Sequence, residues 1–186
     1  MRKNLGILFV SIFLLISLTE KSAVAEGLGL SLGALGGYSS LNASNEFGVG
    51  NGSFGFGAIV GFEFLSILRV NAEWTSTSTT PSGTTTGFTS NLSAYDVSVD
   101  YIIPLIPTKF EIFLGPMLGS GTTSAGGSSG SSMTLGGQAG ADFFTSSSFS
   151  IGAEINYLSV AAPTINGTSG NSGSLIQLLA ALKYWL

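Results

Sequence analysis

Apolar and polar residues alternate along most of this chain, and that alternation limits what it can fold into. In residues 54–64 every second residue is apolar, and glycine fills most of the positions between. A period of two is typical of a β-strand whose two faces meet different surroundings. The pattern occurs eight times, so we expect strands at 27–38, 53–64, 68–77, 91–102, 109–119, 133–143, 149–159 and 174–186.

The polar face of these expected strands carries little charge and much glycine. Charged residues make up 9% of the 186 residues, and 27 residues are glycine. A face that meets water is normally rich in charge. No segment after the N-terminus has the run of about 18 apolar residues that indicates a transmembrane helix. Strands that cross a membrane explain both observations, because their two faces cancel in any average along the chain.

The N-terminus has the layout of an export signal. A basic start and an apolar run over 5–18 precede the small-residue site Ala23–Ala25. This order predicts a secretory signal peptide over residues 1–25. A retained anchor helix is the alternative, but the apolar run is shorter than the roughly 20 residues that span a bilayer. We therefore expect an exported chain whose residues 26–186 form one domain.

The composition excludes several classes of function. Residues 26–186 hold three basic and nine acidic residues, and the chain has no histidine and no cysteine. A nucleic-acid partner is not expected, because there is no basic patch. Catalysis by a Ser–His–carboxylate triad, a His-ligated metal or a thiol is impossible. Asp96 and Asp100 could form a carboxylate pair, but inward acids are more often structural. We predict no enzyme, no metal and no cofactor.

The connections between the expected strands alternate in length. The long ones, rich in Ser, Thr, Gly and Asn, are 39–52, 78–90, 120–132 and 160–173, and the short ones are 65–67, 103–108 and 144–148. Long outer loops and short periplasmic turns are typical of bacterial outer-membrane barrels. The loop composition predicts solvated surface loops with few anchors for a partner, apart from Glu46, Phe47 and Val49 in the first.

Aromatic residues of the apolar face gather at the two ends of the expected strands, as interfacial girdles of a membrane protein do. The girdle expected at the periplasmic edge is Phe62, Phe64, Tyr101, Phe110, Phe143, Phe149 and Tyr184, and that at the outer edge is Tyr38, Phe54, Trp74 and Tyr157. The alternative is a soluble exported barrel or sandwich with its apolar face inside. The girdles and the glycine-rich, charge-poor polar face oppose it.

Taken together, residues 26–186 resemble the small eight-stranded outer-membrane barrels of the OmpA-like and OmpX-like family. The last strand looks like the C-terminal assembly signal of that family, with apolar residues at Leu178, Ala180, Leu182, Tyr184 and Leu186. The family usually ends in Phe or Trp, whereas this chain ends in Leu186 after Trp185. The resemblance implies an all-β, eight-stranded, antiparallel up-and-down transmembrane β-barrel in the cell outer membrane. It also implies contact with outer-membrane lipids and with the barrel-assembly machinery. We expect a monomer.

The polar residues should then point into the barrel, whose eight strands leave room for little more than side chains. The polar residues expected inside are Glu63, Arg69, Glu73, Asp96, Asp100, Lys109, Glu111, Gln138, Asp142, Glu154, Asn156 and Lys183. Buried charges must be paired or hydrogen-bonded, so we predict a salt-bridged network that closes the interior, and hence a structural or surface-exposed role. One alternative is a narrow, low-conductance, cation-preferring pore, with Glu73, Asp96 and Glu154 as its unpaired acids. Another is an adhesin that acts through the outer loops.

Seven apolar residues also fall on inward positions in this register: Leu35, Ile59, Phe113, Met117, Leu175, Leu179 and Trp185. Either they form apolar clusters inside the barrel, or bulges shift the register locally. Pro116 favours a bulge in the strand at 109–119, because a closed barrel has no edge at which a missing N–H is harmless.

Overall fold

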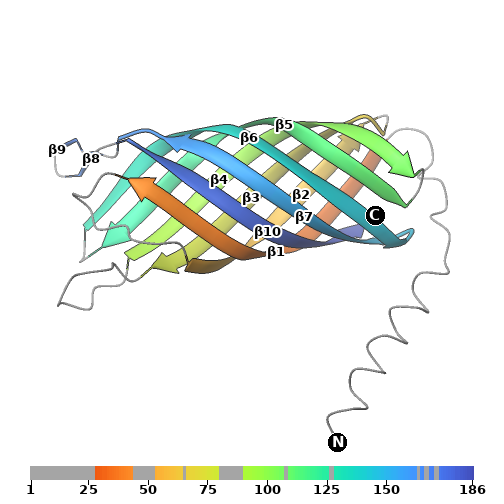
Figure 1. Cartoon of the computed structure of the whole chain (residues 1–186), viewed down its shortest axis with the longest axis horizontal. Helices are drawn as coiled ribbons and strands as arrows, with labels where there is room; N and C mark the ends of the chain where they lie inside the picture. Colours follow the sequence, from red (N-terminus) through yellow and green to blue (C-terminus); the bar gives the residue numbers. More distant parts are fainter. Residues whose placement is uncertain are drawn as a thin grey trace, which may run out of the picture.

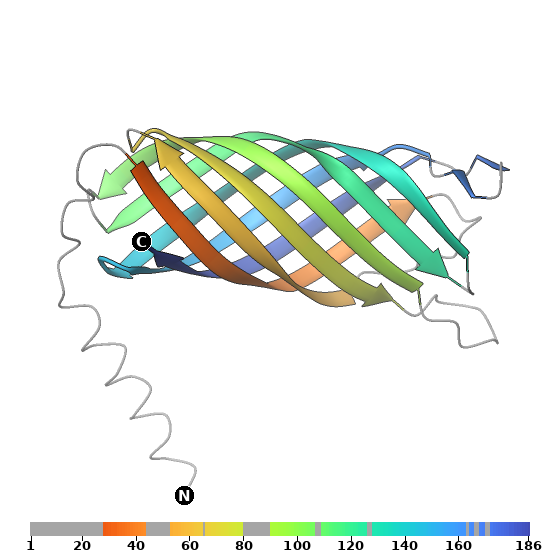
Figure 2. The same ribbon diagram turned by 180° about the vertical axis from the view of Figure 1, so that it is seen from behind.

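The computed structural model describes residues 28–43, 53–64, 66–79, 90–106, 109–125, 128–162, 164–165, 168–169 and 172–186. Eight strands close into one barrel in the order β1-β10-β7-β6-β5-β4-β3-β2, and all neighbours are antiparallel. Figures 1 and 2 show this barrel from opposite sides. The barrel strands are β1 Leu28–Ala43, β2 Ser53–Phe64, β3 Leu68–Thr79, β4 Ser90–Ile106, β5 Phe110–Ala125, β6 Ser128–Ser146, β7 Phe149–Val160 and β10 Gly173–Trp185.

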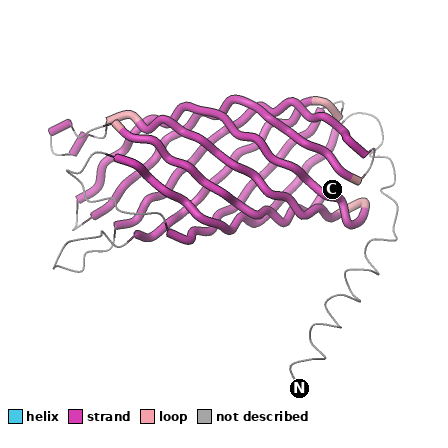
Figure 3. The backbone as a smooth tube through the Cα atoms, in the orientation of Figure 1, coloured by secondary structure: helices cyan, strands magenta, loops and turns pink. Residues whose placement is uncertain are grey.

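This architecture confirms the prediction of an all-β, eight-stranded, antiparallel up-and-down barrel. Strands make up nearly all of the described chain (Figure 3). A further pair of short strands, β8 (Thr164–Ile165) and β9 (Thr168–Ser169), forms its own hairpin between β7 and β10. The described residues contain no helix that is long and apolar enough to cross a membrane. The predicted signal peptide, 1–25, lies outside the described residues.

The two ends of the barrel differ. The end at which β1 begins and β10 finishes carries short connections, including the turn residues 66–67 and 147–148, and is called the turn end here. The opposite end, where the β8–β9 hairpin lies, is called the loop end. The first predicted loop, 39–52, begins too early, because residues 39–43 belong to β1 and pair with β10. The rest of that loop, with Glu46, Phe47 and Val49, and most of the second lie outside the described residues.

The prediction of a long loop over 120–132 is wrong. β5 and β6 continue as paired strands through this segment, from Gly121 opposite Ser132 to Ala125 opposite Ser128. A Ser- and Gly-rich sequence has no apolar alternation to signal a strand. The ladder of backbone hydrogen bonds needs none, because each N–H and C=O is satisfied by the neighbouring strand.

The prediction of a bulge at Pro116 is also wrong. β4 and β5 pair in one register on both sides of this residue, with Ser98 opposite Met117 and Tyr101 opposite Leu114. The ladder is interrupted at the proline, but no extra residue is inserted. The register shifts lie near the turn end instead, between Pro104 and Ile106 and between Phe144 and Ser146.

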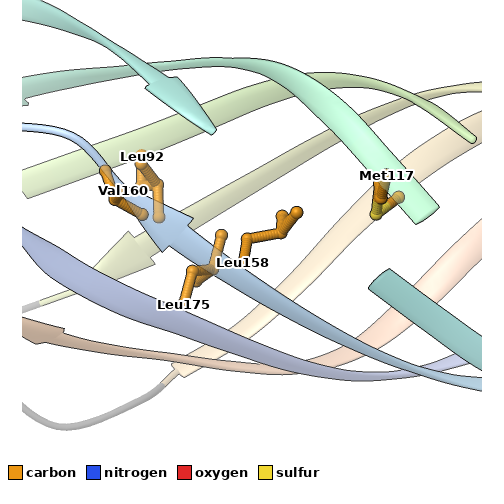
Figure 4. Packing of buried hydrophobic residues seen from close by; sticks show 5 residues of the cluster. All are labelled: Leu92, Met117, Leu158, Val160 and Leu175. Carbon is orange, nitrogen blue, oxygen red and sulfur yellow. The ribbon is translucent and has the colours of Figure 1, made fainter. Parts of the chain in front are cut away.

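The seven inward apolar residues form packed groups inside the barrel, which decides between the two alternatives. All of them are buried. One cluster contains Leu92, Met117, Leu158, Val160 and Leu175, from four strands (Figure 4). A second contains Leu35, Ile59, Leu179 and Ala181. The alternation itself is regular, and β7 and β10 bury every second residue over most of their length.

Candidate functional site

Near the turn end, charged side chains inside the barrel form ion pairs around Arg69 on β3. Its Nη2 lies 2.9 Å from Oε2 of Glu63 and also pairs with Glu111, and its Nη1 lies 2.8 Å from Oδ2 of Asp142. Lys183 on β10 reaches the same Asp142 oxygen at 3.0 Å. These five residues, called the basal cluster below, join strands β2, β3, β5, β6 and β10. The cluster therefore ties together walls that do not neighbour one another.

Aromatic rings close the space around the basal cluster. The guanidinium of Arg69 lies over the rings of Trp185 (4.8 Å to the ring centre) and Phe113 (5.5 Å), and Nζ of Lys183 lies 4.9 Å from the Phe113 ring centre. Trp185 Nε1 donates a hydrogen bond to Ser150 Oγ at 2.9 Å. Cation–π contacts of this kind add stability where the charge is desolvated.

Two aspartates on β4 are held by neutral donors. Oδ2 of Asp100 accepts hydrogen bonds from Asn71 Nδ2 (2.6 Å), Gln138 Nε2 (2.7 Å) and Ser98 Oγ (3.2 Å). Asp96 Oδ1 accepts one from Thr134 Oγ1 at 2.7 Å. All these side chains are buried. Asp96 and Asp100 therefore serve as hydrogen-bond acceptors that fix side chains, and the arrangement offers no general acid–base pair.

Glu73 on β3 and Glu154 on β7 come from strands that do not neighbour each other in the barrel. Asn156 Nδ2 joins the two walls, donating to Glu73 Oε2 at 3.4 Å and to Gln177 Oε1 at 3.5 Å. Gln177 Nε2 in turn donates to Thr75 Oγ1 at 3.0 Å. The described part of the chain shows no ion pair to Glu73 or Glu154.

Lys109 does not lie inside the barrel, so that expectation is wrong. β4 continues to Ile106 and β5 begins at Phe110, which leaves Lys109 exposed in the turn between them. There its backbone N–H donates to Ile106 O at 3.0 Å, and its carbonyl accepts from the N–H of Phe144 at 2.8 Å. A residue one position before a strand can have inward parity and still lie outside the ladder. The other polar residues expected inside are all buried.

Sequence reasoning missed the hydrogen-bonding roles of Asn71, Ser98 and Gln177. All three occupy inward positions of their strands, so parity alone could have identified them. Trp185 and Phe113 were expected inside but without a partner, and their contact with Arg69 and Lys183 could not be read from sequence spacing.

The family comparison agrees with this geometry. The chain matches the family described as Outer membrane protein beta-barrel domain over residues 9–177, which is most of its length. This chain belongs to that family. The family is one of non-catalytic outer-membrane β-barrels, and the protein is a transmembrane β-barrel of the bacterial outer membrane. Comparison with curated proteins gave no match.

Solved structures of outer-membrane barrels share the fold of this protein. The neisserial surface protein A (NspA) superposes with a TM-score of 0.62 at 17% identity, covering 86% of this chain and 97% of its own. Ail, the attachment invasion locus protein of Yersinia pestis, gives 0.53 at 17% identity, covering 87% and 99%. At these identities the likeness shows the fold alone.

On the outer wall of this outer-membrane barrel, an apolar band ends in aromatic residues. Towards the loop end the band stops at Tyr38, Phe54, Trp74, Tyr95 and Tyr157, and the next outward positions include Ser40, Ser76, Ser93 and Ser159. Of the residues expected in girdles, those exposed on the wall are Tyr38, Phe54, Phe64, Tyr101, Phe143, Phe149, Tyr157 and Tyr184, while Phe62, Trp74 and Phe110 are more covered. Tyr95 belongs to the same rim and was not placed there from the sequence.

Proposed function

We propose that this protein is a closed structural barrel that displays polar strands and loops at the cell surface and does not conduct. One observation carries the proposal. Arg69, Asp100, Asp142, Asn156 and Leu158 have a relative exposure of 0%, although all five face the barrel axis. A water-filled channel would leave the polar side chains that line it accessible to water.

Three layers of side chains support the closed interior. The basal cluster with its aromatic rings lies near the turn end, and the hydrogen-bonded acids and amides lie next along the barrel. The third layer, towards the loop end, consists of Leu92, Leu158, Val160 and Leu175, which belong to the apolar cluster that also contains Met117. The last layer is mostly apolar, with the hydroxyls of Thr77 and Thr134 beside Leu92 and Val160. An ion that crossed the barrel would lose most of its water there and find few replacement ligands.

The β5–β6 hairpin supports the surface part of the proposal. Its outward apolar positions end at Leu118 on β5 and Met133 on β6, and the residues beyond them are Ser, Thr, Gly and Ala. The two strands stay paired for about six more residues, or roughly 20 Å at the rise of an antiparallel strand. We propose that the loop end faces outward, so that this hairpin projects from the membrane. Two similar structures carry the names of a surface protein and an attachment protein.

Single cysteines test both parts, because the chain has no cysteine of its own. A membrane-impermeant maleimide should label Ser131→Cys, on the exposed outer half of the hairpin, in intact cells. It should leave Ser98→Cys, a buried inward position, unlabelled until the barrel is unfolded. Fast labelling of folded Ser98→Cys would refute the closed interior. Labelling of Ser131→Cys only after the outer membrane is opened would refute the orientation.

The remaining partners follow from this proposal. The apolar band should contact outer-membrane lipids, and the barrel-assembly machinery should recognise the last strand. The protein should act as a monomer. Cross-linking in membranes that traps a specific homodimer would contradict the last of these.

A further inference from the structure

The outer wall of the barrel is hollowed by a groove that crosses β4, β5, β6 and β7. Its volume is about 620 Å³, it is open on its outer side, and nine residues line it. None of the nine is charged. A hollow of this volume lies within the range of about 300–1,000 Å³ that is usual for ligand sites.

Small residues form the floor of the groove. Pro116 on β5 lies opposite Gly137 on β6, and Ala139 takes the next outward position of β6. A Cβ on the neighbouring, inward Gly115 would collide with the backbone oxygen of Val99, whereas one on Gly137 meets nothing closer than Gly115 O at 3.1 Å. The packing between strands thus requires glycine at 115 far more than at 137. A strand glycine often marks a place where a ligand comes close to the backbone.

Larger side chains stand on both sides of this floor. Tyr101 on β4 pairs with Leu114 on β5, and Ile155 and Tyr157 take successive outward positions on β7. All four are about half exposed, between 49% and 57%. Atoms that line a hollow lose their dispersion contacts unless another molecule fills it. The groove therefore favours a slender apolar occupant that lies between these side chains.

The groove descends from the loop end into the apolar band. Tyr157 is the last apolar outward residue of β7 before Ser159, so it belongs to the loop-end rim. Tyr101 lies three outward positions from Tyr95, the rim residue of β4, and is therefore nearer the turn end. Tyrosine at a membrane surface places its ring among the lipid chains and its hydroxyl among the headgroups. An occupant that begins beside Tyr157 and ends beside Tyr101 thus has the orientation of a lipid chain.

The position of the groove decides what covers it. The barrel is embedded in the outer membrane, and the groove is continuous with the apolar band that meets the lipid chains. A second copy of the barrel is a poor fit, because its wall is convex and would bridge the groove instead of filling it. Stable protein interfaces also use about 20–30 residues a side, whereas nine residues line this groove.

We propose that the groove binds one acyl chain of a lipid from the leaflet at the loop end. The chain lies on Pro116, Gly137 and Ala139, with the lipid headgroup beside Tyr157. Lipid chains are as apolar as leucine, so the preference for this place comes from packing and not from the hydrophobic effect. The site depends on the shape of the wall and would exist whether or not the barrel conducts.

Photo-crosslinking to lipid tests the site. The cysteine-free chain is refolded in phosphatidylcholine vesicles that contain a small share of phosphatidylcholine with a diazirine in one acyl chain. Labelled residues are found by mass spectrometry. Residues 114–118 and 135–139 should be labelled several-fold more than the equally exposed wall around Leu178 and Leu182. The double variant Gly137→Leu, Ala139→Leu fills the floor and should lose this excess. Ala34→Leu, an outward change outside the groove, should keep it.

Each single floor variant should lose part of the excess, so the result does not depend on the folding of the double variant, which the gel shift checks. A diazirine near the headgroup end of the chain should label residues near Tyr157, and one near the methyl end should label residues near Tyr101. The reverse order would overturn the assignment to the loop-end leaflet. Even labelling around the wall, or an excess that survives in the folded double variant, would overturn the site. A cross-linked homodimer that the floor variants abolish would assign the groove to a second copy and overturn it too.

Discussion

Replacing Arg69 by methionine should be among the most destabilising single changes in the barrel. Methionine keeps much of the side-chain length but removes the charge that Glu63, Glu111 and Asp142 share. Lys183 would then be the remaining cation for all three acids. Removing one partner of a buried ion pair costs about 3–5 kcal/mol, because the other charge stays buried. Arg69 has three partners and is fully buried, so we expect a loss of at least that size.

The assay is urea unfolding in lipid vesicles, followed by tryptophan fluorescence and by the gel shift between folded and unfolded forms. The triple variant Arg69→Met, Glu63→Gln, Glu111→Gln leaves Lys183 paired with Asp142 and should recover most of the loss, since neutral replacement of a whole buried network is often tolerated. Lys109→Met, at the exposed turn, should change stability by less than about 0.5 kcal/mol. A single Arg69→Met variant within about 1 kcal/mol of the wild type would refute the buried cluster, and so would a triple variant no more stable than the single one.

Three further predictions concern the packing between strands at Gly136, the hydrogen bond of Trp185, and the closed barrel itself. A Cβ on inward Gly136 would collide with the backbone oxygen of Tyr157, whereas one on outward Gly137 meets nothing closer than 3.1 Å. Gly136→Ala should therefore cost about 1–3 kcal/mol and Gly137→Ala much less, and equal urea midpoints would count against this strand packing. Trp185→Phe removes the hydrogen bond to Ser150 and should lower the free energy of unfolding by about 1 kcal/mol. The outward Trp74→Phe should leave it nearly unchanged. A larger loss for Trp74→Phe than for Trp185→Phe would contradict the inward position of Trp185. Unboiled protein should migrate differently from boiled protein in SDS gels, and identical migration would argue against a closed barrel.

The fold could be predicted because residues that face lipid and residues that face the barrel interior alternate along each membrane strand. In β7 and β10 the alternation is strict, so strand number and inward parity followed directly. The extent of β5 and β6 beyond Leu118 and Met133 did not follow, because Ser, Thr, Gly and Ala occupy both faces of the hairpin there. There the backbone ladder persists without an apolar pattern.

The members of the interior network could be predicted, but their partners could not. Parity placed Arg69 and Asp142 inside, yet their ion pair joins residues 73 positions apart on strands that do not neighbour each other. Which inward residues meet across the barrel depends on the stagger of the strands as the sheet closes, and no local pattern encodes it. The predicted inward position of Lys109 was wrong for a related reason. The register shift between Pro104 and Ile106 moved the end of the ladder, and parity has no meaning outside the ladder.

Electrical recording across a planar lipid bilayer tests the closed interior most directly. Many insertions of the wild-type barrel should give no discrete conductance steps, because the side chains of Leu158 and of the basal cluster around Arg69 are buried inside the barrel. Reproducible ohmic steps in the wild type that disappear in Glu154→Ala and Asp96→Ala would contradict this account and establish a cation-conducting pore.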